Sequence, residues 1–255
     1  MQIVAIGDIH AQEFKFWRIL RETGLSDRNR KPTERALSGG VRVVLLGDLV
    51  HAKSRERYSE LIGVSEYDEY DPEHLRRAET VQERFLREVK EFQDQLPAGT
   101  MVILMGNHDF NAVTEQGPLR TDDVTHLEWK ESASLPEDLF DWISSWQREY
   151  TFEEIHFAHV GPRPEHNTYD QDFYLENRRR WLQQDKDFLS DTPWRLGVYG
   201  HTPVRGGLNL ASQGRAILLD NNGFRDEYSY LLIDTDEDGY RMRLQGLYFD
   251  EYVPR

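Results

Sequence analysis

The stretch LLGDLVHA at residues 45–52 decides the fold, because it carries an apolar, strand-like run directly into Gly47 and Asp48. A buried strand gains nothing from a carboxylate at its end, since burying an unpaired charge is costly. Four other apolar runs also end in polar side chains: AIGDIH at 5–10, LMGNHD at 104–109, IHFAHVG at 155–161 and VYGHTP at 198–203. Ligands of α/β proteins collect at the carboxyl ends of strands, so we expect these side chains to meet at one edge of a sheet.

Hydrophobic periodicity predicts alternating strands and helices in the first half of the chain and mostly strands near its end. The expected strands are residues 2–6, 41–47, 100–106, 152–159, 194–200, 215–220, 228–234 and 240–248. The expected helices are residues 13–24, 72–96, 136–150 and 170–189, and TDEDG at 235–239 is typical of a hairpin turn. Residues 53–71 and 110–135 are expected to be irregular surface insertions. This order predicts one α/β domain over residues 1–255, with a mixed sheet or two sheets packed together.

Composition argues against several classes of protein. The 255 residues contain no cysteine, which excludes disulfides and thiolate metal ligands. No apolar run reaches the ~18 residues that a membrane-spanning helix needs. The first residues lack the basic flank and cleavage site of a secretory signal, so we expect a cytoplasmic protein with no membrane partner. The net charge of -15 disfavours long nucleic acid as a partner, because such a surface repels polyanions.

The residue types at the strand ends suit metal chemistry. Carboxylate, imidazole and amide oxygen are all ligands for divalent metals. Asp8 and His10 are two residues apart, so a strand-like backbone places both side chains on one side. Two cations ~3.5–4 Å apart that share a carboxylate can orient water and stabilise an in-line displacement at phosphorus. A glycine before Asp8, Asp48 and Asn107 lets the strand ends turn sharply and approach one another.

The motifs GDIH, GDLV, GNHD, a single histidine after a strand, and GHTP, in this order, resemble the calcineurin-like metallophosphoesterase superfamily. The resemblance spans roughly residues 3–204. The stretches GHTPV, LDNNG and HVGPRP are most similar to the bacterial branch near serine/threonine phosphoprotein phosphatases and diadenosine tetraphosphate hydrolases. The resemblance implies an α/β four-layer sandwich, in which two mixed β-sheets pack face to face and are flanked by helices.

The resemblance also implies a role for each motif residue. Six residues would hold two divalent metal ions: Asp8 and His10 on the first, Asp48 between both, and Asn107, His159 and His201 on the second. A metal-bridging hydroxide would attack phosphorus, since bound divalent ions lower the pKa of water enough to supply hydroxide near neutral pH. His108 would protonate the leaving oxygen, and a general acid of this kind contributes ~10²–10⁴ in rate.

The sequence departs from the family pattern around the substrate. The phosphatase branch usually reads Gly-Asp-x-Val-Asp-Arg-Gly, whereas this chain has His51 where an Asp orients the catalytic histidine and Ala52 where an Arg grips phosphate. Met105 stands before GNHD in place of an Arg, and Asp109 follows in place of a Glu. Pro203 replaces the second histidine that other branches use on the first metal. The sequence therefore retains the metal ligands of the family pattern but lacks its phosphate-binding residues, so it does not identify the substrate.

Four further residues are weaker candidates for contact with substrate or with a metal ligand. His51 could partner His108, contact substrate or point to solvent. Asp109 could hydrogen-bond a ligand histidine or cap a turn. Arg163 and Arg180 could each contact phosphate, although a solvated face is the simpler interpretation of the basic cluster that contains Arg180.

The remaining histidines carry no motif. His156 lies three residues before His159, so the two are expected on opposite faces of a strand, with a structural role for His156. His74, His126 and His166 are expected at the surface.

The sequence therefore predicts a phosphoric ester hydrolase with two divalent metal ions. Manganese is the expected activator in assay, with iron or zinc as alternatives, because such ligand sets discriminate weakly. The substrate would be a phosphorylated small molecule, a dinucleotide or a phosphoprotein, cleaved as a monoester, or as a diester or pyrophosphate. The alternative of another class is a catalytically silent metal-binding scaffold. Residues 53–71 and 110–135 are expected to wall the pocket over the metals.

Overall fold

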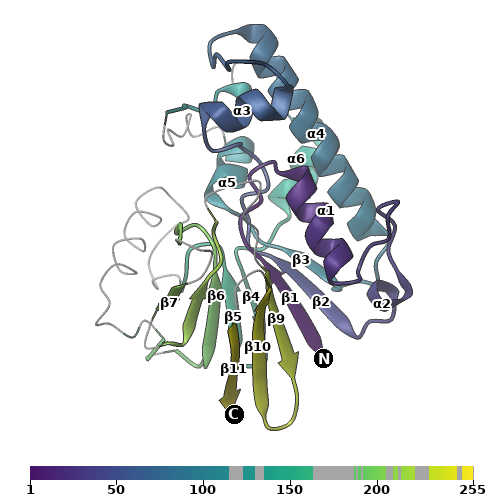
Figure 1. The fold of residues 1–255 in the computed structure, drawn as a ribbon, viewed down its shortest axis with the longest axis vertical. Helices are drawn as coiled ribbons and strands as arrows, with labels where there is room; N and C mark the ends of the chain where they lie inside the picture. The colour runs from purple at the N-terminus through teal and green to yellow at the C-terminus, as the bar shows by residue number, and fades with distance from the viewer. Residues whose placement is uncertain are drawn as a thin grey trace.

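The computed structural model describes residues 1–114, 123–129, 135–162, 187, 189–190, 192–204, 209–211, 214–221, 230–245 and 249–254. The strands are Gln2–Ile6 (β1), Val41–Leu45 (β2), Met101–Ile103 (β3), Glu149–Phe152 (β4), Ile155–Ala158 (β5), Leu196–Tyr199 (β6), Asn209–Ala211 (β7), Ala216–Leu218 (β8), Tyr230–Thr235 (β9), Gly239–Gln245 (β10) and Phe249–Pro254 (β11). The helices are Glu13–Glu22 (α1), Glu34–Leu37 (α2), Arg55–Ile62 (α3), Pro72–Asp94 (α4), Asn107–Thr114 (α5) and Glu137–Ser144 (α6). Figure 1 shows their arrangement.

The strands form two mixed sheets. The first sheet has the order β11-β10-β9-β1-β2-β3, with β1, β2 and β3 parallel and the remaining neighbours antiparallel. The second sheet has the order β4-β5-β6-β8-β7, with a parallel centre and an antiparallel strand at each edge. The hairpin predicted at residues 235–239 is confirmed: Asp236 accepts a hydrogen bond of 2.8 Å from the backbone N–H of Gly239 between β9 and β10.

Alternate side chains of the parallel strands bury against different partners. In β1, Ile3 and Ala5 join an apolar cluster that contains Phe157 of β5 and residues of β6 and β8, so this face packs on the second sheet. Val4 and Ile6 join a separate cluster with side chains of α1, α4 and α6. Full burial of an aliphatic side chain of this size contributes about 1.5–3 kcal/mol. The period-two pattern thus confirms the predicted pair of sheets packed face to face.

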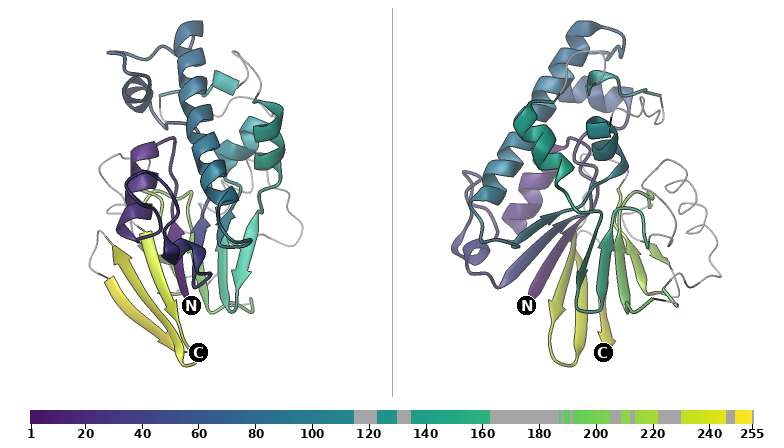
Figure 2. Two further views of the ribbon diagram at one scale, coloured as in Figure 1. Left: turned by 90° about the vertical axis from the view of Figure 1, so that its right-hand side faces the viewer. Right: turned by 180° about the vertical axis from the view of Figure 1, so that it is seen from behind.

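The predicted helices at 13–24 and 72–96 are confirmed as α1 and α4. Asp71 precedes α4 and caps it, because its side chain accepts from the backbone N–H of Glu73, and Pro72 suits the first helical position. Figure 2 shows α1 and α4 over the β1–β2–β3 part of the first sheet, with α3 and one end of α4 projecting beyond the strand ends.

Several boundaries differ from the prediction. Residues 53–71 are not wholly irregular, because Ser54 caps α3 and Gly63 ends it with φ 68°, a left-handed conformation that glycine adopts readily. The predicted helix at 136–150 is wrong beyond Ser144, since β4 begins at Glu149. Residues 163–186, which include most of another predicted helix, lie outside the described residues. The prediction of one domain over residues 1–255 remains a prediction.

Among the described helices, none combines the length and the apolar character needed to cross a membrane.

Candidate metal centre

Strand ends of both sheets supply the predicted metal ligands. Asp8 and His10 follow β1, and Asp48 follows β2. Asn107 begins α5, shortly after β3, while His159 and His201 follow β5 and β6. Several of these residues hold a left-handed backbone, with φ 48° at His10, 50° at Asp48 and 59° at His201. Non-glycine residues rarely adopt this conformation, and where they do it is often at a functional site.

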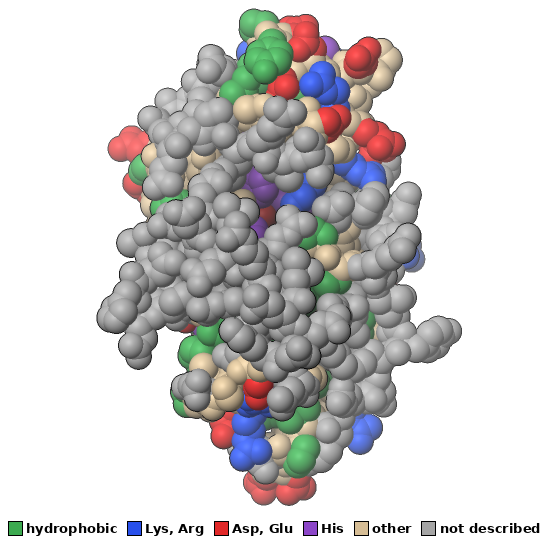
Figure 3. Space-filling view, turned by 90° about the vertical axis from the view of Figure 1, so that its left-hand side faces the viewer, with side chains coloured by type: hydrophobic (Ala, Val, Ile, Leu, Met, Phe, Trp, Pro, Cys, Tyr) green, Lys and Arg blue, Asp and Glu red, His purple; other side chains and the backbone are tan. Residues whose placement is uncertain are grey.

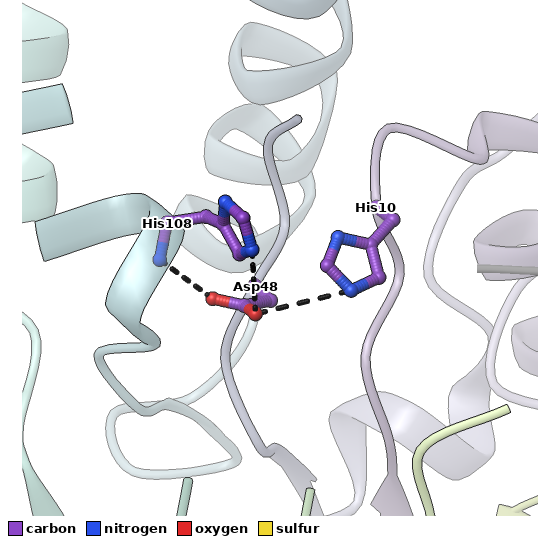
Figure 4. A group of neighbouring side chains, drawn as sticks. All are labelled: His10, Asp48 and His108. Atoms are coloured by element: carbon purple, nitrogen blue, oxygen red, sulfur yellow. Dashed lines mark hydrogen bonds and ion pairs between the residues drawn. The ribbon is translucent and has the colours of Figure 1, made fainter. Parts of the chain in front are cut away.

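Asp48 lies at the centre of the group. Its Oδ1 accepts a hydrogen bond of 2.9 Å from the backbone N–H of His108. Its Oδ2 faces the Nε2 atoms of three histidines, at 3.3 Å from His159, 3.8 Å from His10 and 3.9 Å from His108. Figure 4 shows His10 and His108 on either side of this carboxylate. One oxygen is therefore fixed by the backbone while the other faces three histidine nitrogens.

The other predicted ligands form two groups of contacts near Asp48. Asp8 Oδ2 lies 3.7 Å from His10 Nε2, and both Asp8 oxygens accept from the backbone N–H of His201 at 3.1 Å. In the second group, Asn107 Oδ1 lies 3.1 Å from His159 Nε2 and 2.9 Å from His201 Nδ1. The structure thus brings all six predicted ligands together.

Backbone carbonyls orient two of the histidines. His10 Nδ1 lies 2.9 Å from the carbonyl oxygen of His51, and His159 Nδ1 lies 2.8 Å from that of Leu46. A carbonyl only accepts, so each Nδ1 carries the proton that it donates. In the neutral ring, this tautomer leaves the Nε2 lone pair aimed at Asp48, which is how ligand histidines are commonly held.

The donor set fits divalent cations. His10 Nε2 and Asp48 Oδ2 are both buried and have no hydrogen-bond partner among the described residues. Two lone-pair atoms facing each other repel unless a proton or a cation lies between them, and a buried polar atom without a partner is costly. Two overlapping groups, His10–Asp48–His108 and Asp48–His159–His201, place one ligand atom of each residue within 4.8 Å of the others.

The pKa shifts of the site residues also favour a bound cation. Burial, followed by Asp220, raises the pKa of Asp8 well above its ordinary value. Burial alone would raise the pKa of Asp48, but His159 and His108 lower it well below its usual range. Burial alone would lower the pKa of His159, whereas the carboxylates of Asp48 and Asp8 raise it to about 9. A proton on His159 therefore partly neutralises a cluster of negative charge that a cation would neutralise more fully.

Two glycines allow the strand ends to come this close. A Cβ atom on Gly106 would lie 2.1 Å from Asp48 Oδ1, and one on Gly200 would lie 2.2 Å from Asp8 Oδ1. Both positions therefore require glycine because of the space that the neighbouring carboxylates occupy.

Asp109 supports the loop that carries Asp48. Its side chain accepts from the backbone N–H of Asp48 at 2.7 Å, of Leu49 at 3.0 Å and of Gly106 at 3.1 Å. These contacts match the turn-capping alternative for Asp109 among the described residues. Burial, followed by Asp48, raises the pKa of Asp109 to about 7.

The structure places several other histidines. His51 is 0% exposed, so it does not point to solvent, and His126 is 2% exposed, so its predicted surface position is wrong. Tertiary contacts explain both, because Glu128 contacts His51 and Tyr58 of α3 contacts His126. His156 is buried, stacks on Trp194 and contacts Tyr199, in line with a structural role. His74 is partly exposed. Arg163, His166 and Arg180 lie outside the residues that the structure describes.

Sequence reasoning missed three residues near the centre. Asp220 is buried and has a carboxylate oxygen within 4.8 Å of ligand atoms of Asp8 and His10. It follows β8 as the predicted ligands follow their strands, so the same signal could have identified it. Glu128 is fully buried and Lys53 is 8% exposed. Nothing in the sequence pattern around Glu128 or Lys53 indicates that either residue lies near the site.

Comparison with known proteins identifies the family. A model of the calcineurin-like phosphoesterase family matches residues 1–231. The chain belongs to the calcineurin-like phosphoesterase family. It is therefore a phosphoric ester hydrolase of a family that uses divalent metals, and its His and Asp groups suit that chemistry. A comparison with curated protein sequences finds no match.

Two solved phosphatase structures are similar to this calcineurin-like phosphoesterase to different degrees. The cold-active protein tyrosine phosphatase of a psychrophilic Shewanella species is 14% identical, with a TM-score of 0.59 over 98% of this chain and 80% of that one. A protein serine/threonine phosphatase from Saccharomyces cerevisiae is 12% identical, with a TM-score of 0.48 over 91% of this chain and 72% of that one. At such identities the first likeness shows the fold alone, and the second is too weak to support an argument.

Proposed function

We propose that this phosphoesterase hydrolyses a phosphate ester at a dinuclear metal centre, with His108 as general acid. The observation that carries the proposal is the Oδ2 atom of Asp48, buried and faced by the Nε2 atoms of three histidines at 3.3–3.9 Å. A carboxylate with one oxygen tied to the backbone and the other surrounded by nitrogen ligands suits a position between two cations.

Each side of Asp48 offers one set of ligands. Asp8 and His10 would hold the first cation, and Asp220 lies close enough to support it. Asn107, His159 and His201 would hold the second. When bound, the cations supply hydroxide from water near neutral pH and neutralise charge on the phosphoryl oxygens. Manganese is the proposed activator in assay, since oxygen and imidazole ligands suit it and discriminate weakly among divalent metals.

His108 is positioned for proton transfer. Its backbone N–H is fixed to Asp48, and its Nε2 lies 3.9 Å from Asp48 Oδ2, so this nitrogen faces the place where the ester would lie. Burial lowers the pKa of His108 well below its ordinary value in the protein alone. From this position the ring would give its Nε2 proton to the leaving oxygen. Protonation of the leaving group is most valuable for esters whose alcohol is a poor leaving group.

The substrate reaches the centre from its more open side. Asn107 and His201 are only partly buried, whereas Asp8 and His10 are fully buried. Figure 3 shows histidine and carboxylate atoms in a recess of this face, beside atoms of a Lys or Arg side chain. A small phosphorylated molecule, a dinucleotide or an extended phosphopeptide would fit the family's chemistry here.

Lys53 is the proposed phosphate contact. It follows Ala52, the position at which the family arginine is missing, and it is 8% exposed with φ 52°. Its charge acts on both Asp8 and His10, which places it near the first ligand set. A buried ammonium in a chain of net charge -15 suits an anionic ligand, and it favours the dianionic monoester over the diester.

A comparison of esters tests the proposal. Metal-stripped protein reconstituted with manganese should hydrolyse nitrophenyl phosphate or bis(nitrophenyl) phosphate, and a wider panel of phosphorylated metabolites and dinucleotides should follow. Faster hydrolysis of the monoester supports the assignment of Lys53, and faster hydrolysis of the diester supports the diesterase or pyrophosphohydrolase alternative. If the reconstituted protein hydrolyses no member of the panel, the scaffold alternative replaces the proposal.

A further inference from the structure

A buried cluster of polar side chains lies beside His108, and none of its members was needed for the metal centre. The histidine–glutamate cluster consists of His51, Tyr58, Gln82, His126 and Glu128. All five are at most 2% exposed. They come from the loop after β2, from α3, from α4 and from residues 123–129, so the fold assembles the cluster from four separate segments.

Glu128 is the carboxylate on which this cluster converges. Its Oε1 lies 2.8 Å from His51 Nδ1 and 3.0 Å from Gln82 Nε2, and it also accepts from the hydroxyl of Tyr58. Several donors on one oxygen are typical of an ionised carboxylate, which can only accept. Burial alone would raise the pKa of Glu128, but His51 holds it well below its usual range.

The direction of these hydrogen bonds fixes the tautomers. Because Glu128 only accepts, His51 donates from Nδ1, and in the neutral ring its Nε2 is an acceptor. Because Tyr58 donates its proton to Glu128, its oxygen accepts from His126 Nδ1 at 2.9 Å. Burial, followed by His51, lowers the pKa of His126 to about 3, so this ring is neutral and its Nε2 is also an acceptor.

His108 presents the complementary atom. Its Nε2 faces Asp48, and its Nδ1 points away from Asp48 (Figure 4). This Nδ1 is buried without a hydrogen-bond partner among the described residues, and so is Nε2 of His51. The ring centroids of His51 and His108 are 5.2 Å apart, and those of His126 and His108 are 5.0 Å apart. A proton on His108 Nδ1 would supply the donor that the acceptor on His51 lacks.

We propose that the His51–Glu128 pair positions the general acid: Glu128 holds His51 in the tautomer whose Nε2 accepts the Nδ1–H of His108. Glu128 is thus a positioning residue that acts on His108 through an intervening histidine, and no net proton moves along the chain of hydrogen bonds. The inference rests on the proposed function, because it assigns a partner to the proposed acid.

The backbone gives independent support. His51 has φ 65° and His126 has φ 42°, both in the left-handed region. Such conformations cost free energy and persist where surrounding contacts impose them, which is common at functional sites. The strain lies at the two histidines whose rings neighbour that of His108.

A third cation is the competing occupant of this cluster. His51, His126 and Glu128 each place a ligand atom within 4.8 Å of the others. Glu128 Oε1 already accepts from His51, Gln82 and Tyr58, however, so a cation bound to this oxygen would have to displace those donors. Hydrogen bonding therefore explains the geometry better than metal binding does.

Histidine ring nitrogens report the tautomers directly in the metal-free protein. Heteronuclear NMR of wild type should show His51 with its proton on Nδ1, and Glu128→Gln should change the tautomer or the shift of that ring. A matched control is Glu149→Gln, which alters a second buried histidine's contact, His156 Nε2 to Glu149 Oε2 at 2.9 Å, away from the cluster. A wild-type His51 protonated only on Nε2 overturns the proposal whatever the activity.

Leaving-group dependence tests the link to His108. With manganese bound, Glu128→Gln should reduce kcat for phenyl phosphate about 10–100-fold, and for nitrophenyl phosphate much less, since nitrophenolate leaves without protonation. KM should be unchanged in Glu128→Gln. In Glu149→Gln, neither kcat nor KM should change for either ester. Diphenyl and bis(nitrophenyl) phosphate replace these esters if the enzyme prefers diesters. An equal loss on both leaving groups, or loss of a third metal equivalent in Glu128→Gln, overturns the proposal.

A double variant and a milder variant complete the test. If Glu128 acts through His108, then His108→Ala/Glu128→Gln should be no slower than His108→Ala, whereas multiplied losses show that the two act independently and overturn the proposal. Should Glu128→Gln fail to fold, Tyr58→Phe removes one donor to Glu128 and keeps the ring, and it should shift the leaving-group dependence in the same direction. Activity absent from wild type on every ester refutes the proposed function, while the NMR outcome still decides the tautomer.

Discussion

The backbone N–H of His108 donates a hydrogen bond of 2.9 Å to Oδ1 of Asp48, so the proposed acid and the proposed bridging carboxylate are fixed to each other. The two residues follow neighbouring parallel strands, β2 and β3. The contact leaves Asp48 Oδ2 directed toward the three histidines and holds the His108 ring on the same side. The relative position of the proposed metal ligand and the proposed acid therefore depends on backbone geometry at the strand ends.

Gly106→Ala should disrupt this arrangement. The new Cβ atom would lie 2.1 Å from Asp48 Oδ1, so the carboxylate or the strand end must move. Overpacking of this kind costs about 1–3 kcal/mol in the free energy of unfolding. We expect lower stability in urea unfolding and weaker manganese binding by calorimetry. Gly40→Ala is the control, because its Cβ would lie 3.5 Å from the nearest heavy atom, Ser38 Oγ; equal effects of the two substitutions would contradict the explanation.

Asp109→Ala should destabilise the loop that carries Asp48. The substitution removes the acceptor for the backbone N–H groups of Asp48, Leu49 and Gly106. Each buried donor left without a partner costs about 1–3 kcal/mol. Asp109→Asn keeps one acceptor oxygen and should lose less stability. Denaturant unfolding of the three metal-free proteins measures the difference, and the same stability for Asp109→Ala and wild type would show that water replaces the carboxylate.

Lys53→Met should weaken the binding of phosphate monoesters. A hydrogen bond to a charged group contributes about 1.5–3 kcal/mol, which corresponds to about 10–100-fold in KM for a rapidly dissociating substrate. Lys53→Arg should retain much of the affinity, because it keeps the charge. Lys31→Met, which removes an exposed lysine, serves as the control. Steady-state kinetics on nitrophenyl phosphate checks the prediction, and an unchanged KM in Lys53→Met would remove Lys53 from the substrate site.

Much of the site was predictable because its residues follow a short sequence pattern at the ends of strands. When a strand is followed by glycine and then by a predicted ligand residue, that residue lies at the edge of the sheet. Asp8 and Asp48 follow this rule. The start of α4 was equally predictable from Asp71 and Pro72. Asp220 obeys the same rule as Asp8 and could have been included.

The remaining features depend on tertiary structure. Nothing near His126 or Glu128 in the sequence indicates that α3 and α4 will bury them beside His108. The strands β7 and β11 lie at sheet edges, where pairing with a neighbour decides the conformation more than local propensity does. The predicted helix at 136–150 continued too far because Trp142 and Trp146 share helical spacing, although the chain turns after Ser145 to begin β4.

The metal content of the reconstituted protein tests the central claim most directly. Protein stripped with a chelator, reloaded with manganese and freed of excess ion should retain about two equivalents per chain and regain hydrolysis that the stripped protein lacks. Asp48→Asn should lose both properties, because it replaces the carboxylate that faces both ligand sets. If wild type retains no tightly bound divalent ion, or if stripped protein hydrolyses phosphate esters as fast as reloaded protein, the dinuclear account is contradicted.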